Sequence, residues 1–176
     1  MLKLEDYIRT IPDHPKPGIM FRDITPLLAN RVAFNVAIDK IVSGVTHEGL
    51  DAVAGIDARG FIFGAAVASA LGLGFIPVRK KGKLPGKIIS EEYDLEYGKD
   101  SLELSVEDVK AGQRVMLIDD LIATGGTAIA ALSLLRRCDV EVVSAAFVVD
   151  LPDLGGAEKL KKAGCPVSVL IGYAGH

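Results

Sequence analysis

Short apolar runs rich in valine, isoleucine and alanine alternate along this chain with segments whose apolar residues recur at helical spacing. The predicted strands are 52–56, 75–78, 115–118, 140–149 and 167–171, and the predicted helices are 4–11, 26–43, 60–71, 126–137 and 155–162. Strands that alternate with helices form βαβ units, in which a parallel sheet is covered on both faces. We therefore predict an α/β fold, with a single-domain parallel-sheet core and flanking helices, over residues 1–176.

Composition excludes several other classes of protein. With 49% hydrophobic residues and a net charge of −3, the chain has enough apolar surface to fold. The uncharged window 60–78 is nearly long enough to cross a membrane, but glycines and Pro77 interrupt it, so we predict a buried helix and strand there. The charged amino terminus has no apolar signal core, so we expect a cytoplasmic protein. The mild acidity argues against nucleic-acid binding.

Two cysteines and three histidines are present, and their spacing suggests neither a disulfide framework nor a metal cluster. Residues 80–104 interrupt the alternation of strands and helices. They are polar, carry charges of both signs and show weak β alternation. A long polar insertion between core elements is typical of an active-site flap rather than a second domain.

The stretch Val115–Thr127, VMLIDDLIATGGT, combines a strand, two acids and a glycine-rich loop that opens into a helix. Open parallel sheets bind ligands at the carboxyl ends of their strands. Glycines let backbone amides point into one concavity, and a helix amino terminus adds positive potential, so the loop predicts a phosphate site. Hydroxyl groups of Thr124 and Thr127 could add donors.

The two acids, Asp119 and Asp120, need a different explanation because carboxylates repel a phosphate. They suit the hydroxyl groups of a ribose, or a Mg²⁺ ion that the ligand carries. A sugar phosphate satisfies both halves of the motif. Acid pairs also occur at strand ends without any ligand, and Asp-Asp by itself would favour that interpretation; the whole motif does not.

A strongly cationic segment follows the second predicted strand. Five cations lie within nine residues: Arg79, Lys80, Lys81, Lys83 and Lys87. Such runs are commonly solvated surface. Cations that close over an anionic leaving group would instead stabilise the charge that develops in the transition state.

The strand, the acid pair and Ala-Thr-Gly-Gly-Thr together resemble the phosphoribosyl-pyrophosphate motif of the type I phosphoribosyltransferases. Residues 17–24, 58–64, 79–86 and 93–98 resemble, in order and spacing, the members of that family that act on adenine. The resemblance covers nearly the whole chain. It implies a Mg²⁺-dependent, homodimeric transferase of purine salvage, which converts adenine and 5-phosphoribosyl 1-pyrophosphate (PRPP) into AMP and pyrophosphate.

The resemblance also implies roles for individual residues. The 5′-phosphate loop comprises Ala123, Thr124, Gly125, Gly126 and Thr127, and Asp119 and Asp120 hold the ribose. The pyrophosphate contacts are Asp57, Ala58, Arg59, Arg79, Lys80 and Lys83. In the family, the peptide that here joins Asp57 to Ala58 is often cis. No direct metal ligand is expected, because PRPP carries the Mg²⁺, with Asp119 and Asp120 as candidates to assist.

For the base, the resemblance implies a hood formed by residues 1–30. Phe21 would stack on the purine, the backbone of Met20 and Arg22 would meet its edge, and Leu151 would close the other side. The candidate catalytic residues are Glu96, as an acid/base on the flap, and Arg59. The alternatives are that Phe21 is plain hydrophobic packing and that Arg59 is a surface residue at a helix start.

Two other functions remain open at this point. One is the same transfer to a 6-oxopurine such as xanthine, hypoxanthine or guanine. The other is a regulator that keeps the site as a nucleotide sensor, although no segment is available to supply a DNA-binding element. Two residues depart from the family pattern: Ala58 replaces a small hydroxyl residue, and Met20 is bulkier than the usual valine.

Overall fold

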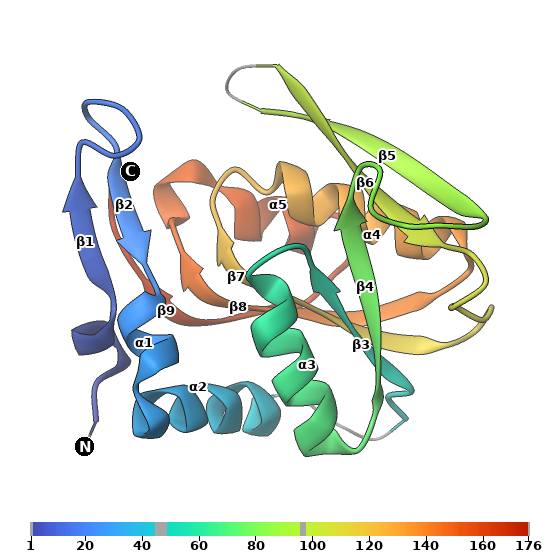
Figure 1. Cartoon of the computed structure of the whole chain (residues 1–176), viewed down its shortest axis with the longest axis horizontal. Coiled ribbons are helices and arrows are strands. Elements are labelled where there is room, and N and C mark those ends of the chain that lie inside the picture. Colours follow the sequence, from blue (N-terminus) through green and yellow to red (C-terminus); the bar gives the residue numbers. More distant parts are fainter. Residues whose placement is uncertain (1, 45–48, 96–97, 176) are drawn as a thin grey trace.

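The computed structural model describes residues 2–44, 49–95 and 98–175. The elements are η1 (Leu4–Tyr7), β1 (Arg9–Pro12), β2 (Met20–Asp23), α1 (Thr25–Ala29), α2 (Arg31–Ser43), β3 (Ala52–Ile56), α3 (Gly60–Leu71), β4 (Gly74–Lys80), β5 (Ile88–Asp94), β6 (Lys99–Ser105), β7 (Arg114–Ile122), α4 (Gly126–Arg137), β8 (Glu141–Asp150), η2 (Pro152–Leu154), α5 (Gly156–Lys162) and β9 (Val167–Gly172). Within the described residues, seven strands form a sheet of order β5-β6-β4-β3-β7-β8-β9, and β1 and β2 form a separate pair (Figure 1).

The centre of the large sheet is parallel and covered on both faces, as the sequence predicts. Strand β3 pairs in parallel with β4 and β7, and β8 pairs in parallel with β7 and β9. Ala52 and Ala54 of β3 belong to the core that contains α4 and α5, whereas Val53 belongs to the core that contains α2 and α3. Successive side chains of this buried strand therefore pack alternately against two layers of helices.

The uncharged window 60–78 consists of α3 followed by β4, which confirms the predicted helix and strand. No helix among the described residues is long and apolar enough to cross a membrane.

The sequence prediction of a helix over 4–11 is wrong. Only Leu4–Tyr7 is helical, as a 3₁₀ turn, and β1 then pairs antiparallel with β2. Leu4 and Ile8 are both buried, so their helical spacing results from burial of both side chains and not from a continuous helix. The predicted helix 26–43 is divided at Asn30, whose side chain accepts hydrogen bonds from the first amides of α2.

Strand β7 is longer than the predicted 115–118 and ends at Ile122. Its pairing with β8 continues through Asp119↔Phe147 to Ile122↔Asp150. The two acids therefore lie within the strand and not in the loop after it. Sheet geometry holds their backbone in place.

The polar insertion is a β-hairpin of β5 and β6 that extends the sheet. Strand β6 pairs antiparallel with the end of β4, through Arg79↔Glu103 and Lys80↔Leu102. Arg137 of α4 donates a hydrogen bond of 2.7 Å to the Ser90 carbonyl of β5. The base of the hairpin thus rests on α4, beyond the edge of the parallel core (Figure 1).

The carboxylate of Asp23 links the two-stranded segment to α1. It accepts a 2.9 Å hydrogen bond from the Thr25 amide and pairs with Arg9 at 2.7 Å. Hydrogen bonds from Thr25, and then the contact with Arg9, lower the pKa of Asp23 from 3.8 to about 2. Because this folded-state pKa is depressed, the stabilisation is present above the unfolded pKa and is lost as pH falls toward the folded value.

We expect Asp23→Asn to lower the free energy of unfolding by about 1–2 kcal/mol at neutral pH. The difference from the parent protein should shrink as pH falls from about 4 toward the folded pKa. Urea unfolding of both proteins at about pH 6 and about pH 3 measures this. An equal difference at both pH values would contradict the assignment.

Candidate functional site

A cavity of about 470 Å³ lies at the carboxyl ends of β3, β4 and β7. Its walls are residues 57–59 after β3, Lys80 at the end of β4, and residues 119–128 from the end of β7 into α4. These segments are far apart in the sequence. They meet because parallel strands deliver their carboxyl ends to the same edge of the sheet.

The predicted phosphate loop, residues 123–127, rests directly on the start of α5. Gly125 has φ +85° and precedes α4, a backbone conformation that favours glycine. A Cβ at Gly125 would lie 2.9 Å from the Gly156 Cα, and the Gly156 amide donates a 3.0 Å hydrogen bond to the Ala123 carbonyl. The backbone of the phosphate loop and the backbone at the start of α5 are therefore in direct contact, with no side chain between them.

Gly156 is a site residue that the sequence reasoning missed. A Cβ on it would lie 2.4 Å from the Ala123 oxygen, so glycine is required for the loop to sit where it does. The only available signal was the pair Gly155-Gly156 before a short helix. Glycine at a helix start has too many ordinary explanations for that signal to identify a site.

The acid pair and Arg59 form one cluster beside this loop. The Asp120 carboxylate is 5% exposed and pairs with the Arg59 Nε at 2.7 Å, while its amide donates to the Asp119 Oδ1 at 2.8 Å. Desolvation, and then the neighbouring Asp120 charge, raise the pKa of the Asp119 carboxyl. A Cβ at Gly60 would lie 2.8 Å from the Asp119 Oδ1, so α3 can begin this close to the acids only with glycine.

The loop after β3, residues 57–59, lines the same cavity as the phosphate loop. The peptide between Asp57 and Ala58 is cis. Asp57 Oδ2 accepts hydrogen bonds of 3.3 Å from the Arg79 Nε and from the Lys80 amide. The loop is therefore tied to the start of the cationic segment. Lys83 is exposed and does not line the cavity, although its carbonyl accepts from Arg79 at 3.4 Å.

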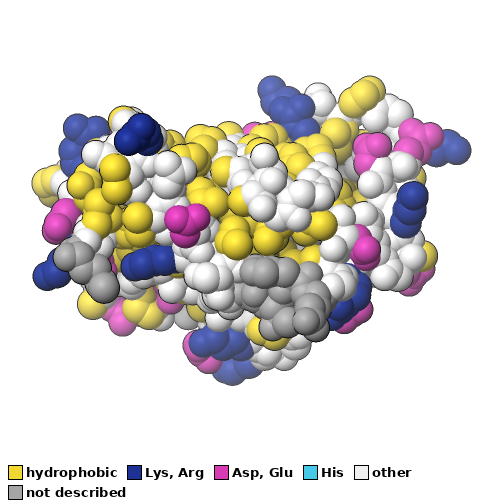
Figure 2. Space-filling view, turned by 90° about the horizontal axis from the view of Figure 1, so that it is seen from below, with side chains coloured by type: hydrophobic (Ala, Val, Ile, Leu, Met, Phe, Trp, Pro, Cys, Tyr) yellow, Lys and Arg dark blue, Asp and Glu magenta, His cyan; other side chains and the backbone are white. Residues whose placement is uncertain are grey.

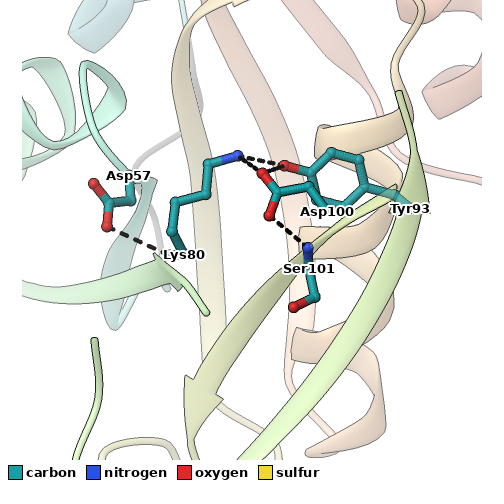
Figure 3. Close-up of polar contacts among 5 residues, drawn as sticks. All are labelled: Asp57, Lys80, Tyr93, Asp100 and Ser101. Carbon is teal, nitrogen blue, oxygen red and sulfur yellow. Dashed lines mark hydrogen bonds and ion pairs between the residues drawn. The ribbon is translucent and has the colours of Figure 1, made fainter. Parts of the chain in front are cut away.

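Lys80 connects the cavity to the hairpin (Figure 3). Its Nζ lies 2.7 Å from the Asp100 Oδ2 and also donates to the Tyr93 hydroxyl, which itself donates to Asp100 at 3.0 Å. Burial opposes the charge, but the hydrogen bonds to Asp100 and Tyr93 raise the pKa of Lys80. The ring of Tyr93 also lies beside Gly126, where an added Cβ would be 3.8 Å from its Cδ2. Tyr93 and Asp100 were not among the predicted site residues.

The predicted base-binding residues lie outside the cavity walls. Phe21 lies near one wall residue, because the Arg59 guanidinium carbon is 5.9 Å from its ring centroid. The Arg22 side chain turns away, to the Thr10 hydroxyl at 2.6 Å and the Tyr173 ring at 4.2 Å. Leu151 is buried, and its amide donates to the Ile122 carbonyl at the end of β7.

Of the two remaining predicted residues, the structure describes Met20 but not Glu96. Met20 is 37% exposed at the start of β2. Glu96 lies outside the described residues, in the connection between β5 and β6.

Taken together, these features define an α/β protein whose cavity, at the carboxyl ends of parallel strands, combines a glycine-rich helix start, cations and two acids. Residues 28–170 match the family described as the phosphoribosyl transferase domain. The chain belongs to the phosphoribosyltransferase family, whose reaction with PRPP is metal-assisted.

Relatives of nearly the same length show which kind of phosphoribosyltransferase this chain is. The chain is 56% identical to the adenine phosphoribosyltransferase of Bradyrhizobium sp. (strain BTAi1), over 99% of this chain and 98% of that protein. It is 53% identical to the adenine phosphoribosyltransferase of Maricaulis maris (strain MCS10), over 99% of each. Within the phosphoribosyltransferases, it is therefore one of the enzymes that form AMP from adenine in purine salvage.

Solved structures agree with this placement. The adenine phosphoribosyltransferase of Thermoanaerobacter pseudethanolicus is 46% identical, with a TM-score of 0.91 over 97% of this chain and 100% of that one. The enzyme of Saccharomyces cerevisiae is 37% identical, with a TM-score of 0.87 over 96% of each chain. That structure holds adenine and an imino-altritol bisphosphate.

Proposed function

We propose that the cavity binds PRPP between the phosphate loop and the Asp57–Arg59 loop, and that the phosphoribosyl group passes to N9 of adenine. The arrangement of the cavity carries this proposal. Its lining combines a glycine-rich helix start, the cations Arg59 and Lys80, and the carboxylates of Asp119 and Asp120. These three features suit the 5′-phosphate, the pyrophosphate and the ribose of a single substrate.

At the phosphate end, residues Ala123 to Thr127 hold the 5′-phosphate with backbone amides and with the hydroxyls of Thr124 and Thr127. Asp119 and Asp120 accept hydrogen bonds from the ribose hydroxyl groups. The Arg59 side chain neutralises part of the acid pair, which lowers its repulsion of an anionic substrate.

At the other end, Asp57, Ala58 and Arg59 contact the pyrophosphate, with Arg79, Lys80 and Lys83 as further cations. Pyrophosphate gains negative charge as its bond to the sugar breaks, so cations fixed beside it stabilise the transition state most. The oxocarbenium-like sugar is attacked by N9 on the face opposite the leaving group.

For the base, Phe21 stacks on adenine, the backbone of Met20 and Arg22 meets the purine edge, and Leu151 closes the other side. The short distance between Phe21 and Arg59 supports this, because it brings the hood of residues 1–30 to the pyrophosphate loop. Adenine loses its N9 proton during attack, and Glu96 is the proposed acid/base. That role rests on the motif match in residues 93–98.

The metal is proposed to be Mg²⁺, carried by PRPP. The donor set fits this, because Asp119 and Asp120 offer the hard oxygen ligands that Mg²⁺ prefers. When bound, the ion would neutralise charge on the pyrophosphate. Asp120 is buried and has one oxygen on Arg59, whereas Asp119 is only partly buried, so Asp119 is the better placed of the two to assist.

We further propose a cytoplasmic homodimer, with residues 1–176 as one domain and 80–104 as its flexible flap. The face formed by α2 and α3 supports the dimer. It exposes Val32 at 52% and Ile62 at 42%, and Figure 2 shows apolar side chains gathered over its centre. Contiguous apolar surface of this kind is typical of protein interfaces.

The substrate assignment predicts a preference for adenine. With PRPP and Mg²⁺, we expect turnover of adenine on the order of 100-fold above hypoxanthine, guanine or xanthine, because a 6-oxo group leaves the purine-edge donors and acceptors unpaired. Release of pyrophosphate, measured with each base, provides the test. Faster turnover of any 6-oxopurine would favour the alternative substrate class.

A further inference from the structure

A lysine of α5 holds the phosphate loop from behind. Lys159 Nζ donates a 2.8 Å hydrogen bond to the Thr124 carbonyl. One helical turn earlier, Gly156 donates to the carbonyl of the preceding loop residue, Ala123. Helix α5 therefore holds two consecutive loop carbonyls, although it lies more than 30 residues further along the chain.

We propose that Lys159 is a positioning residue for the 5′-phosphate of the substrate. It fixes the orientation of the peptide between Thr124 and Gly125, and it adds positive charge behind the loop. The inference deepens the proposed function, on which it rests.

Peptide planarity explains how a bond to a carbonyl can prepare an anion site. The Thr124 carbonyl and the Gly125 amide belong to the same planar, trans unit and point in opposite directions. While Lys159 holds the carbonyl outward, the Gly125 N–H faces away from Lys159. A flip of this peptide would instead aim a carbonyl oxygen at a phosphate dianion and remove an amide donor.

Glycine makes such a flip easy, which is why an external hold matters. Rotation of this peptide changes ψ of Thr124 and φ of Gly125, and glycine tolerates both signs of φ. Gly125 has to be glycine because it has φ +85° and contacts Gly156. The loop therefore needs glycine at position 125 for its backbone conformation, but glycine does not restrict that conformation. The hydrogen bond from Lys159 restricts it.

The neighbouring lysine on the same helix provides a matched control. Lys161 is exposed, as Lys159 is, but its Nζ pairs with Glu158 of α5 at 2.7 Å. Removing either side chain changes the net charge equally. Only the loss of Lys159 should release the Thr124 carbonyl.

We expect Lys159→Met to raise KM for PRPP and Kd for AMP about 10-fold, because the substitution removes a charge-assisted hydrogen bond and one nearby charge. KM for adenine and inhibition by pyrophosphate should stay within about twofold, because neither ligand carries a 5′-phosphate. Lys159→Arg should recover part of the loss, and Lys161→Met should match the parent protein. Steady-state kinetics and calorimetric titration with AMP measure these values.

Two results would overturn the inference. One is unchanged affinity for PRPP and AMP in Lys159→Met. The other is an equal weakening of adenine, pyrophosphate and AMP, which would indicate general damage to the site. Titration with ribose 5-phosphate separates this test from the proposed function. A protein without transferase activity would contradict the proposed function. A loss of ribose 5-phosphate affinity confined to Lys159→Met would still support the positioning role of Lys159.

Discussion

Gly125→Ala is expected to lower kcat/KM for PRPP on the order of 100-fold or more, comparable to the loss of a fixed backbone donor at a charged site. Alanine at φ +85° is strained, and its Cβ would lie 2.9 Å from the Gly156 Cα and 3.0 Å from the Gly156 oxygen. Both contacts are with backbone that cannot swing aside. The loop has to move, and its amides leave the phosphate. Initial rates at varied PRPP measure the effect.

Gly112→Ala is the matched control for Gly125→Ala. Gly112 has φ +78°, so alanine there carries similar backbone strain, but an added Cβ would meet no atom within 4 Å. It lies in the turn before β7, at the amino end of that strand. We expect about 1 kcal/mol of lost stability and unchanged kinetics. Equal kinetic losses in the two variants would show that backbone strain lowers activity wherever it lies, and would contradict a specific effect of the contact between Gly125 and Gly156.

Arg59→Met is expected to lower kcat/KM about 100- to 1,000-fold. The substitution removes a cation proposed to contact pyrophosphate. It also leaves the Asp120 carboxylate, 5% exposed, without its 2.7 Å partner and beside Asp119. The substrate then meets an uncompensated acid pair. Asp120 is buried although the Arg59 side chain is half exposed, so removal of Arg59 leaves a buried charge without its partner, which is costly.

A double-mutant cycle separates the two consequences of Arg59→Met. If repulsion from Asp120 contributes, Arg59→Met combined with Asp120→Asn should lose less than the sum of the single changes. Arg114→Met serves as a surface control, because Arg114 pairs with Glu141 at the opposite end of β7. Strict additivity in the cycle would mean that Arg59 acts on the substrate alone. Wild-type activity in Arg59→Met would exclude any role in the transfer.

Much of the core was predictable because burial leaves a periodic pattern. Strand β3 and helices α3 and α4 begin and end where the sequence predicts. These elements are buried on several sides, so their apolar residues repeat with the period of the element. Residues 9–11 were predicted to be helical, and they form strand because the antiparallel pairing with β2 depends on residues beyond their own window. Strand β7 likewise extends through two acids because β8 continues beside it.

The candidate site was predictable only in part. The motif from Asp119 to Thr127 is local, and the structure places all of it around the cavity. The partners of this motif are not local. Lys159 and Gly156 support the loop from α5, and Tyr93 and Asp100 hold Lys80 from the hairpin. No short spacing links these pairs in the sequence.

The fold class and the family could be inferred from contiguous residues or from a short period in the sequence, and the same kind of local motif predicts the phosphate loop. The groups that surround that loop come from distant parts of the chain, and only their packing brings them together. The carboxyl ends of β3, β4 and β7 bring Arg59, Lys80 and the acid pair to one edge of the sheet. Close contact between Gly125 and Gly156 depends on how two helices dock on that sheet, and packing across the core sets this distance.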